Sequence, residues 1–533
     1  MRRFAIVAVF LAALTSAVSG SGAGARSLDE GGTFRMAISL IANFGSIDPA
    51  LYGLEGRALR PACAALMSYP DKPLPAGLVL APELAQSGPV VSRDRKTYTF
   101  TIRKDARFSD GSAVTARDFV HALERTLDPK MKSGGGAFFG DIVGAREMLA
   151  GKATRLAGAV ANGRTLRLRL TKPVPNFLAR LSGLCAVASS LPADPEGAKA
   201  PLASPAPYYV SEYVPGERVV LERNRFYHGQ RPHHVARITI DLQGNASAVA
   251  DVASGKLDHV APTPDLNPEL AGLARRYGVN RARLFIEPDT ITRMFLMNTS
   301  RPLFRNNVPL RRALNYAADR RALAREYGPY AATPTDHYLP RGLPGYRNVR
   351  IYPLRGPNLR RARALARGHT RSGKAVLYTC SDRPDCIGVA QVLQQNLRAI
   401  GMKLQIKQFP LGLMFQKLAT PGEPFDLAWI GFFPAFPDPE DMLNIFDGRT
   451  IGQPDSFNWS YFNERTYNRL FARAGRLSGA QRYRAYGKLD VRLARDAAPA
   501  IAVVNANTWA FVSKRVGCVV MNPVLDLTAV CLK

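Results

Sequence analysis

The most constraining feature of this sequence is a strand–helix–strand pattern in its second half. Residues 374–378 are predominantly apolar and predict a strand, and a helical pattern follows over about 387–400. Gly401 fits the end of that helix, and residues 402–406 then alternate between apolar and polar as a second strand. A helical crossover of this kind connects parallel strands. The pattern therefore predicts an α/β fold.

The length and composition are those of a large globular protein. A chain of 533 residues corresponds to roughly three to four structural units. Hydrophobic residues make up 46% of the chain and charged residues 21%, which allows a large core. After the N-terminus, no apolar run reaches the ~18–20 residues that a membrane-spanning helix needs.

The N-terminus has the pattern of a secretory signal peptide. Arg2 and Arg3 precede an apolar run over residues 4–18, and small residues follow up to Ala25. We expect cleavage after Ala25 and a free exported protein that a periplasm would retain. An N-terminal membrane anchor is the alternative, but the run is short for one. The first cysteine is Cys63, so a lipoprotein anchor would have no acceptor at the cleavage site.

Six cysteines fit an oxidising compartment. They are Cys63, Cys185, Cys380, Cys386, Cys518 and Cys531. Six cysteines allow about fifteen pairings. Proximity in the sequence favours pairing the third with the fourth and the fifth with the sixth, which leaves the first two. A metal site is the alternative, but no C-x-x-C pair or cysteine cluster with histidine spacing is present.

The chain is strongly basic, with a formal net charge of +30. Such a surface could serve an anionic ligand, an anionic membrane face or nucleic acid. The Arg and Lys residues are scattered through every predicted element and do not gather into one aromatic-interleaved strip. We therefore expect a solvated basic surface and no nucleic-acid partner.

Patterns that would indicate catalysis or a cofactor are missing. The glycine-rich segment 132–137 lacks the G-x-x-x-x-G-K-(S/T) pattern of a phosphate loop, so the chain is not expected to be an ATPase. His233 and His234 form the only histidine cluster, and a surface loop explains them better than a metal site. No G-x-S-x-G elbow occurs. We expect no metal, no cofactor and no enzymatic activity; an exported hydrolase is the competing class.

Several strands, turns and helices can be predicted in sequence order. A strand over 97–103 leads to a turn at Asp110-Gly111 and a helix that Thr115 caps. An apolar strand ending at Asn298-Thr299 is followed by a proline turn and a basic amphipathic helix. One side of that helix is apolar and consists of Ala313, Leu314, Ala317 and Leu323. A hairpin over 209–224 and a strand over 426–431 complete the set.

Together these segments resemble the bacterial extracellular solute-binding proteins of family 5, over about residues 30 to 515. The resemblance implies a two-lobed α/β fold of the type II periplasmic-binding-protein class, with mixed sheets and a hinge between the lobes. Lobe 1 would comprise residues 26–290 and 506–533, with an extra subdomain inserted over about 60–200. Lobe 2 would comprise 291–505, so the chain would cross the hinge near 290 and 505.

The resemblance also implies a function. The chain would be the substrate-binding component of an ABC importer and deliver a peptide or peptide-like solute to a membrane permease. Permease and ATPase subunits would be its partners, with peripheral contact to the membrane complex, and the protein would be a monomer. A receptor for a non-peptide solute, such as an opine, a sugar derivative or a metal chelate, is the alternative within this class.

The segment after the 426–431 strand departs from the family pattern. Aligned on Pro437-Asp438-Pro439, Ala435 occupies the position of the aspartate that anchors a peptide ammonium group in the family. Free-amine peptides should therefore bind poorly unless Asp438 or a neighbouring acid replaces that anchor. We expect eight side chains to contact ligand, and packing in the core is the alternative for the aromatic ones. They are Phe44, Tyr208, Trp429, Phe432, Phe433, Phe436, Asp438 and Trp459.

Overall fold

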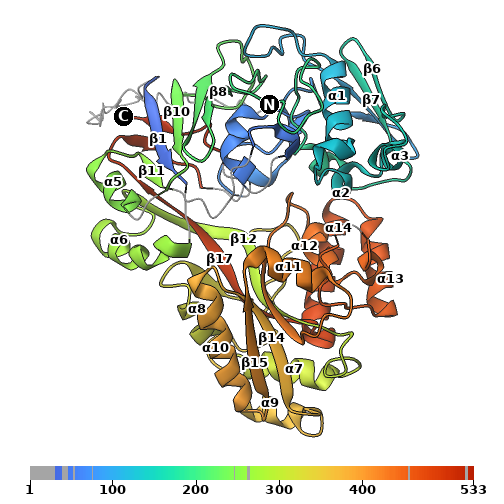
Figure 1. Cartoon of the computed structure of the whole chain (residues 1–533), viewed down its shortest axis with the longest axis vertical. Helices are drawn as coiled ribbons and strands as arrows, with labels where there is room; N and C mark the ends of the chain where they lie inside the picture. The colour runs from blue at the N-terminus through green and yellow to red at the C-terminus, as the bar shows by residue number, and fades with distance from the viewer. Residues whose placement is uncertain are drawn as a thin grey trace, which may run out of the picture.

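A computed structural model describes residues 31–38, 46–51, 55–74, 76–244, 247–260, 264–453, 456–521 and 526–533 (Figure 1). The predicted signal peptide and Phe44 lie outside these residues. No helix within the described ranges combines the length and the apolarity needed to cross a membrane.

One large mixed sheet runs through the molecule, with β12 and β17 at its centre. Its strands, in spatial order, are β15 (Lys403–Phe409), β14 (Lys374–Cys380), β16 (Leu427–Phe432), β12 (Leu284–Met297), β17 (Ala500–Val512), β11 (His259–Val260), β1 (Thr33–Ala37), β10 (Arg237–Asp241), β9 (Arg218–Arg223) and β8 (Tyr208–Val214). A short strand, β13 (Ala332–Pro334), also pairs with β17. The predicted α/β class is confirmed.

The strand–helix–strand unit predicted from the sequence is present. Helix α10 (Pro384–Arg398) connects β14 to β15, and the two strands pair in parallel with Leu377 opposite Ile406. The helix begins three residues earlier than predicted because Pro384 stands in its first turn, where a missing backbone N–H is not needed. Gly401 has a φ of 81°, which a glycine adopts without strain.

Strands β12 and β17 connect the two halves of the molecule (Figure 1). They pair antiparallel, and their register shifts between Pro288 and Thr292. Just beyond this shift, Asn505 Nδ2 donates to Thr292 Oγ1 at 2.9 Å, and both side chains are buried. The crossing points predicted near residues 290 and 505 fall within these two strands.

The basic helix predicted after Asn298-Thr299 is two helices, α7 (Val308–Ala317) and α8 (Arg320–Arg325). The helix is interrupted just before Asp319. The Asp319 carboxylate accepts a hydrogen bond from Ala322 N and caps the second helix. The buried guanidinium of Arg320 donates to the carbonyl oxygens of Thr335 and Ala502. The predicted apolar side is nevertheless correct, since all four of its residues are buried.

A separate subdomain follows the first strand. Its four-stranded sheet has the order β4 (Val90–Val91), β5 (Thr97–Thr101), β7 (Thr165–Arg169), β6 (Ala159–Asn162). Helix α1 (Ala116–Leu127) buries Phe119 and Leu123 in the subdomain core, and Thr115 and Asp118 form the predicted capping box. The short helices α2 (Gly136–Phe139), α3 (Ala145–Leu149) and α4 (Phe177–Leu181) complete this unit, which faces α12 and α14 of the other half (Figure 1).

Two further sheets have two strands each, namely β2 (Met67–Ser68) with β3 (Ala81–Pro82) and β18 (Val516–Cys518) with β19 (Cys531–Leu532). The other α-helices are α5 (Ala248–Ser254), α6 (Leu270–Tyr277), α9 (Leu359–Ala366), α11 (Leu411–Ala419), α12 (Pro439–Leu443), α13 (Arg465–Gly475) and α14 (Gly479–Arg492). The three disulfides are Cys63–Cys185, Cys380–Cys386 and Cys518–Cys531, which is the pairing that sequence proximity favoured.

Candidate functional site

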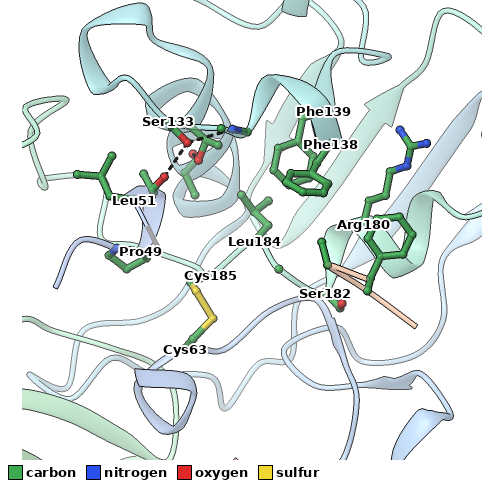
Figure 2. Close-up of a pocket in the computed structure, with 18 of the residues that line it drawn as sticks. Pro49, Leu51, Cys63, Ser133, Phe138, Phe139, Arg180, Ser182, Leu184 and Cys185 are labelled. Atoms are coloured by element: carbon green, nitrogen blue, oxygen red, sulfur yellow. Dashed lines mark hydrogen bonds between the residues drawn. A yellow bond between two sulfur atoms is a disulfide. The ribbon is translucent and has the colours of Figure 1, made fainter. Parts of the chain in front are cut away.

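A pocket of about 560 Å³ lies where the subdomain meets the loop after β16 (Figure 2). This volume is within the range of small-ligand sites in proteins. The first half of the chain contributes residues 49–51, one side of α1, the segment 132–135, α2, and the segment from α4 to Val187. Strand β12 contributes Thr290, and the second half contributes one continuous segment, residues 433–437. That segment lies about 250 to 390 positions after the lining residues of the subdomain side.

Carboxylates behind the loop hold residues 433–437 in place. Asp438 accepts from Glu440 N at 2.9 Å and so caps α12, directly after the loop. The same carboxylate accepts two hydrogen bonds of 2.9 Å from the buried guanidinium of Arg482. Asp441 Oδ2 accepts from Ala435 N at 2.5 Å. Burial raises the pKa of Asp441 to about 7, although this hydrogen bond opposes the shift.

Two contacts beside the pocket connect the halves directly. The rings of Phe138 and Phe436 meet edge to face with centroids 6.2 Å apart. Asn176 Nδ2 donates to Glu440 Oε2 at 2.9 Å, and Glu440 also accepts from Arg482. The subdomain and the loop after β16 are thus in contact around the pocket.

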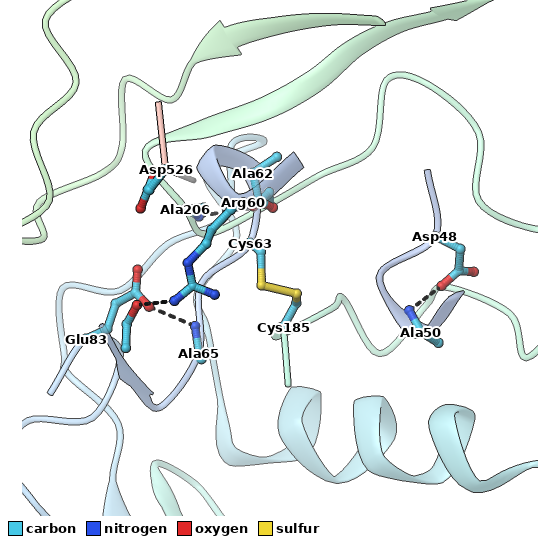
Figure 3. The surroundings of a disulfide bond; sticks show 12 residues. Asp48, Ala50, Arg60, Ala62, Cys63, Ala65, Glu83, Cys185, Ala206 and Asp526 are labelled. Carbon is cyan, nitrogen blue, oxygen red and sulfur yellow. Dashed lines mark hydrogen bonds between the residues drawn. A yellow bond between two sulfur atoms is a disulfide. The ribbon is translucent and has the colours of Figure 1, made fainter. Parts of the chain in front are cut away.

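The disulfide between Cys63 and Cys185 forms part of the pocket wall (Figures 2 and 3). Both cysteines are buried, and the bond joins the end of the 3-10 helix at Glu55–Ala62 to the segment after α4. Figure 3 shows Asp48 on one side of the bond and Glu83 with Asp526 on the other. The wall therefore depends on a covalent link between segments 122 residues apart.

Buried ion pairs lie in this wall and next to it. Arg125 donates from its two terminal nitrogens to both oxygens of Asp48, at 3.0 and 2.5 Å. Arg231 donates to Glu83 at 2.8 Å and to Asp526 at 2.8 Å. In each case the charges compensate each other inside the protein, as burial requires.

The structure brings together part of the predicted site. Phe433 and Phe436 line the pocket, and Ala435 lies between them in the same wall. Phe432 is the last residue of β16 and is partly buried, with its ring 5.7 Å from that of Phe457. It is adjacent to the pocket wall and does not line it.

Four other predicted contacts do not line the pocket. Tyr208 is fully buried and donates its hydroxyl to Val235 O at 2.9 Å. Trp429 packs against Phe295 in the core beneath the sheet, with ring centroids 4.5 Å apart. Trp459 is also buried, and its ring stacks on a neighbouring phenylalanine. Asp438 is held by Arg482, so its carboxylate is already paired inside the protein.

The half of the pocket contributed by the subdomain was not predicted. The glycine-rich segment was assigned no role in binding, but its run Gly134–Gly136 passes close to α1. A Cβ atom on Gly135 would lie 1.9 Å from Thr126 Cγ2, so a larger residue there would have to displace Thr126. The run was therefore a signal of close backbone approach. Arg180 and Leu184 had no comparable signal.

Metal ligands are not gathered at this site. Within the described ranges, no group of three or more His, Cys, Asp or Glu side chains is placed to hold a metal ion. The arrangement offers apolar rings, backbone groups and cationic side chains, which can bind a small ligand.

Comparison with known proteins agrees with this geometry. Residues 79–453 match the sequence profile of the bacterial extracellular solute-binding proteins, family 5. The periplasmic oligopeptide-binding protein OppA of Salmonella typhimurium is 26% identical over 443 residues, which cover 78% of each chain. The periplasmic murein peptide-binding protein MppA of Escherichia coli is 24% identical over 413 residues, or 72% of each chain.

Solved structures share the fold over nearly the whole length. The clavulanic acid biosynthesis oligopeptide binding protein 2 has a TM-score of 0.84 at 23% identity, and the match covers 95% of this chain and 96% of that one. The Haemophilus influenzae OppA complex with RPPGFSPFR has a TM-score of 0.70 at 20% identity, with 95% and 100% covered. With a family profile matched over most of its length, the chain belongs to the bacterial extracellular solute-binding proteins of family 5.

Proposed function

We propose that this protein is the substrate-binding component of an ABC importer that captures a peptide or peptide-like solute and delivers it to a membrane permease. The observation that carries the proposal is a ligand-sized pocket with walls from both halves of a family 5 chain. Relatives described as periplasmic oligopeptide- and murein peptide-binding proteins support a peptide-like ligand and a periplasmic location. Export through a signal peptide at residues 1–25 is consistent with both.

Ligand capture would use motion between two lobes, comprising residues 26–290 with 506–533 and residues 291–505. We place the hinge at the register shift between β12 and β17, because two strands bend more easily there than in a regular ladder. A ligand in the pocket would contact the subdomain and residues 433–437 together. It would therefore stabilise the closed arrangement, in which those surfaces are near each other.

The position of Ala435 bears on how a peptide would bind. In the family pattern this position holds the acid that pairs with a peptide's ammonium group, and here it is a methyl group in the pocket wall. A buried ammonium group without its counter-ion costs on the order of 3–5 kcal/mol. Asp438 does not replace the anchor, since Arg482 holds it. We expect free-amine peptides to bind poorly and the rings of Phe433 and Phe436 to contact apolar parts of the ligand.

The function can be tested on protein isolated without denaturation. Native mass spectrometry should detect a bound small molecule, and its fragmentation should identify a peptide or a peptide-like compound. Incubation of the protein with that compound should change tryptophan fluorescence without forming products. Release of cleaved product would instead establish an enzyme and overturn the proposal.

A further inference from the structure

The charged side chains that line the pocket have one sign. Of the described residues in its wall, those with a charge are Arg60, Arg125, Lys132 and Arg180. None of the described lining residues is Asp or Glu. A concave surface with cations and no facing carboxylate has a positive potential, which a low-dielectric wall focuses into the pocket.

Two of these four cations, Arg60 and Lys132, make no ion pair with a carboxylate among the described residues, whereas Arg125 and Arg180 each have one. Arg125 is neutralised by Asp48 and cannot serve a ligand without losing that pair. Arg180 pairs with Asp141 at 3.5 Å, but it shares that carboxylate with Lys172. Arg60 donates to a serine hydroxyl, and its Nε is buried without a hydrogen-bond partner. The ammonium group of Lys132, an exposed residue on the pocket rim, makes no ion pair with any described residue.

The carboxylates near the pocket are already occupied by protein groups. Asp48 holds Arg125, and Asp141 is closer to Lys172, at 2.9 Å, than to Arg180. Asp438 pairs with Arg482, and Asp441 accepts from the backbone N–H of Ala435. A cationic ligand group would therefore enter a positive pocket in which these four carboxylates, among the described side chains, are already bound to protein groups. An anionic group would meet Arg60 and Lys132, which make no ion pair with a carboxylate in the described part of the chain.

We propose that the pocket selects a peptide-like ligand with a net negative charge, whose carboxylate is held by the cations of the subdomain wall. This inference rests on the proposed function and adds the charge of the ligand to it. These cations lie in separate parts of the pocket. Figure 2 shows Ser133, the residue after Lys132, on one side of Phe138 and Phe139, and Arg180 on the other side. A carboxylate at one end of a short ligand would reach one of these cations, and the apolar rings between them would contact the body of the ligand.

A defined peptide pool tests the charge directly. The pool contains di- to tetrapeptides in equal amounts, as matched anionic, neutral and cationic sets, each with free and with N-acetylated amino ends. The protein is equilibrated with the pool, separated from unbound peptide and analysed by mass spectrometry. Enrichment of the anionic sets supports the inference. Retention of neutral or cationic peptides in preference to anionic ones overturns it while leaving peptide binding intact. Retention of no peptide overturns the proposed function itself.

A pair of lysine variants then locates the effect. Lys132→Gln removes a cation from the pocket rim, and Lys130→Gln removes one from an exposed position in the same turn that does not line the pocket. For the most enriched anionic peptide, titration calorimetry should show an affinity loss of about three- to fivefold for Lys132→Gln, near the upper end for one exposed charge pair. Lys130→Gln should change the affinity less than about twofold. Equal losses in the two variants would indicate a general effect of net charge and contradict a site in the pocket.

Discussion

The Cys63–Cys185 disulfide should contribute both to stability and to ligand binding, and replacing both cysteines by alanine tests this. The bond closes a loop with a sequence separation of 122 residues. On the loop-entropy estimate, losing it should lower the free energy of unfolding by about 5 kcal/mol at 25 °C. Because both cysteines line the pocket, we also expect a clear loss of ligand affinity.

The matched control is the double alanine variant of Cys380 and Cys386. That disulfide joins the end of β14 to α10, has a sequence separation of 6 and does not line the pocket. The same estimate gives about 2 kcal/mol for its loss, with ligand affinity unchanged. Urea unfolding followed by far-ultraviolet circular dichroism measures the stabilities, and calorimetry measures binding of a retained peptide. Equal losses of stability in the two variants, or unchanged binding in the first, would refute the reasoning.

Three further changes probe the support of the pocket and the second half of the chain. Asp48→Asn leaves Arg125 buried without its counter-charge and should lower the free energy of unfolding in urea by about 3–5 kcal/mol. Asp105→Asn breaks a partly exposed pair with Arg103 and should lower it by less than about 1 kcal/mol. Similar losses in the two variants would contradict the role given to burial. Burial opposes protonation of His337, but its hydrogen bond to Asp490 and the charge of that acid raise its pKa above 6.5. Its protonation should therefore stabilise the fold at and below about pH 6.5, and this stability should be lost as pH rises through the raised pKa. His337→Gln should flatten the pH dependence of the free energy of unfolding between pH 6 and 8. An unchanged slope would rule out a stabilising charge on His337. Ala435→Asp should improve binding of free-amine peptides by about tenfold or more over the parent protein, with N-acetylated peptides as the control; an equal change for both would show that the new acid does not meet an ammonium group.

Local patterns predicted those parts of the fold that neighbouring residues determine. The strand–helix–strand unit at 374–406 could be recognised because its helix and both strands have their own periodicity. The capping box at Thr115 and Asp118 could likewise be recognised, since its partners are three residues apart. The division of the basic helix was not predicted. Asp319 gives a local capping signal for it, whereas the buried contact of Arg320 with a carbonyl oxygen of β17, at Ala502, has no local signal.

The two sides of the pocket also differ in whether local sequence patterns could identify them. Residues 433–437 could be identified because they follow a strand and depart from a family pattern at Ala435. The acid beside them, Asp438, was expected to face a ligand, but it is bound by Arg482, which is 44 positions later in the chain. Sequence periodicity does not reveal an ion pair between residues so far apart in the chain. The pair between Asp48 and Arg125 is a second example. These pairings bear on the charge of the pocket. Asp48 and Asp438 are held by protein guanidinium groups, while all four charged residues of the described pocket wall are cations, so we expect the wall to favour an anionic ligand group.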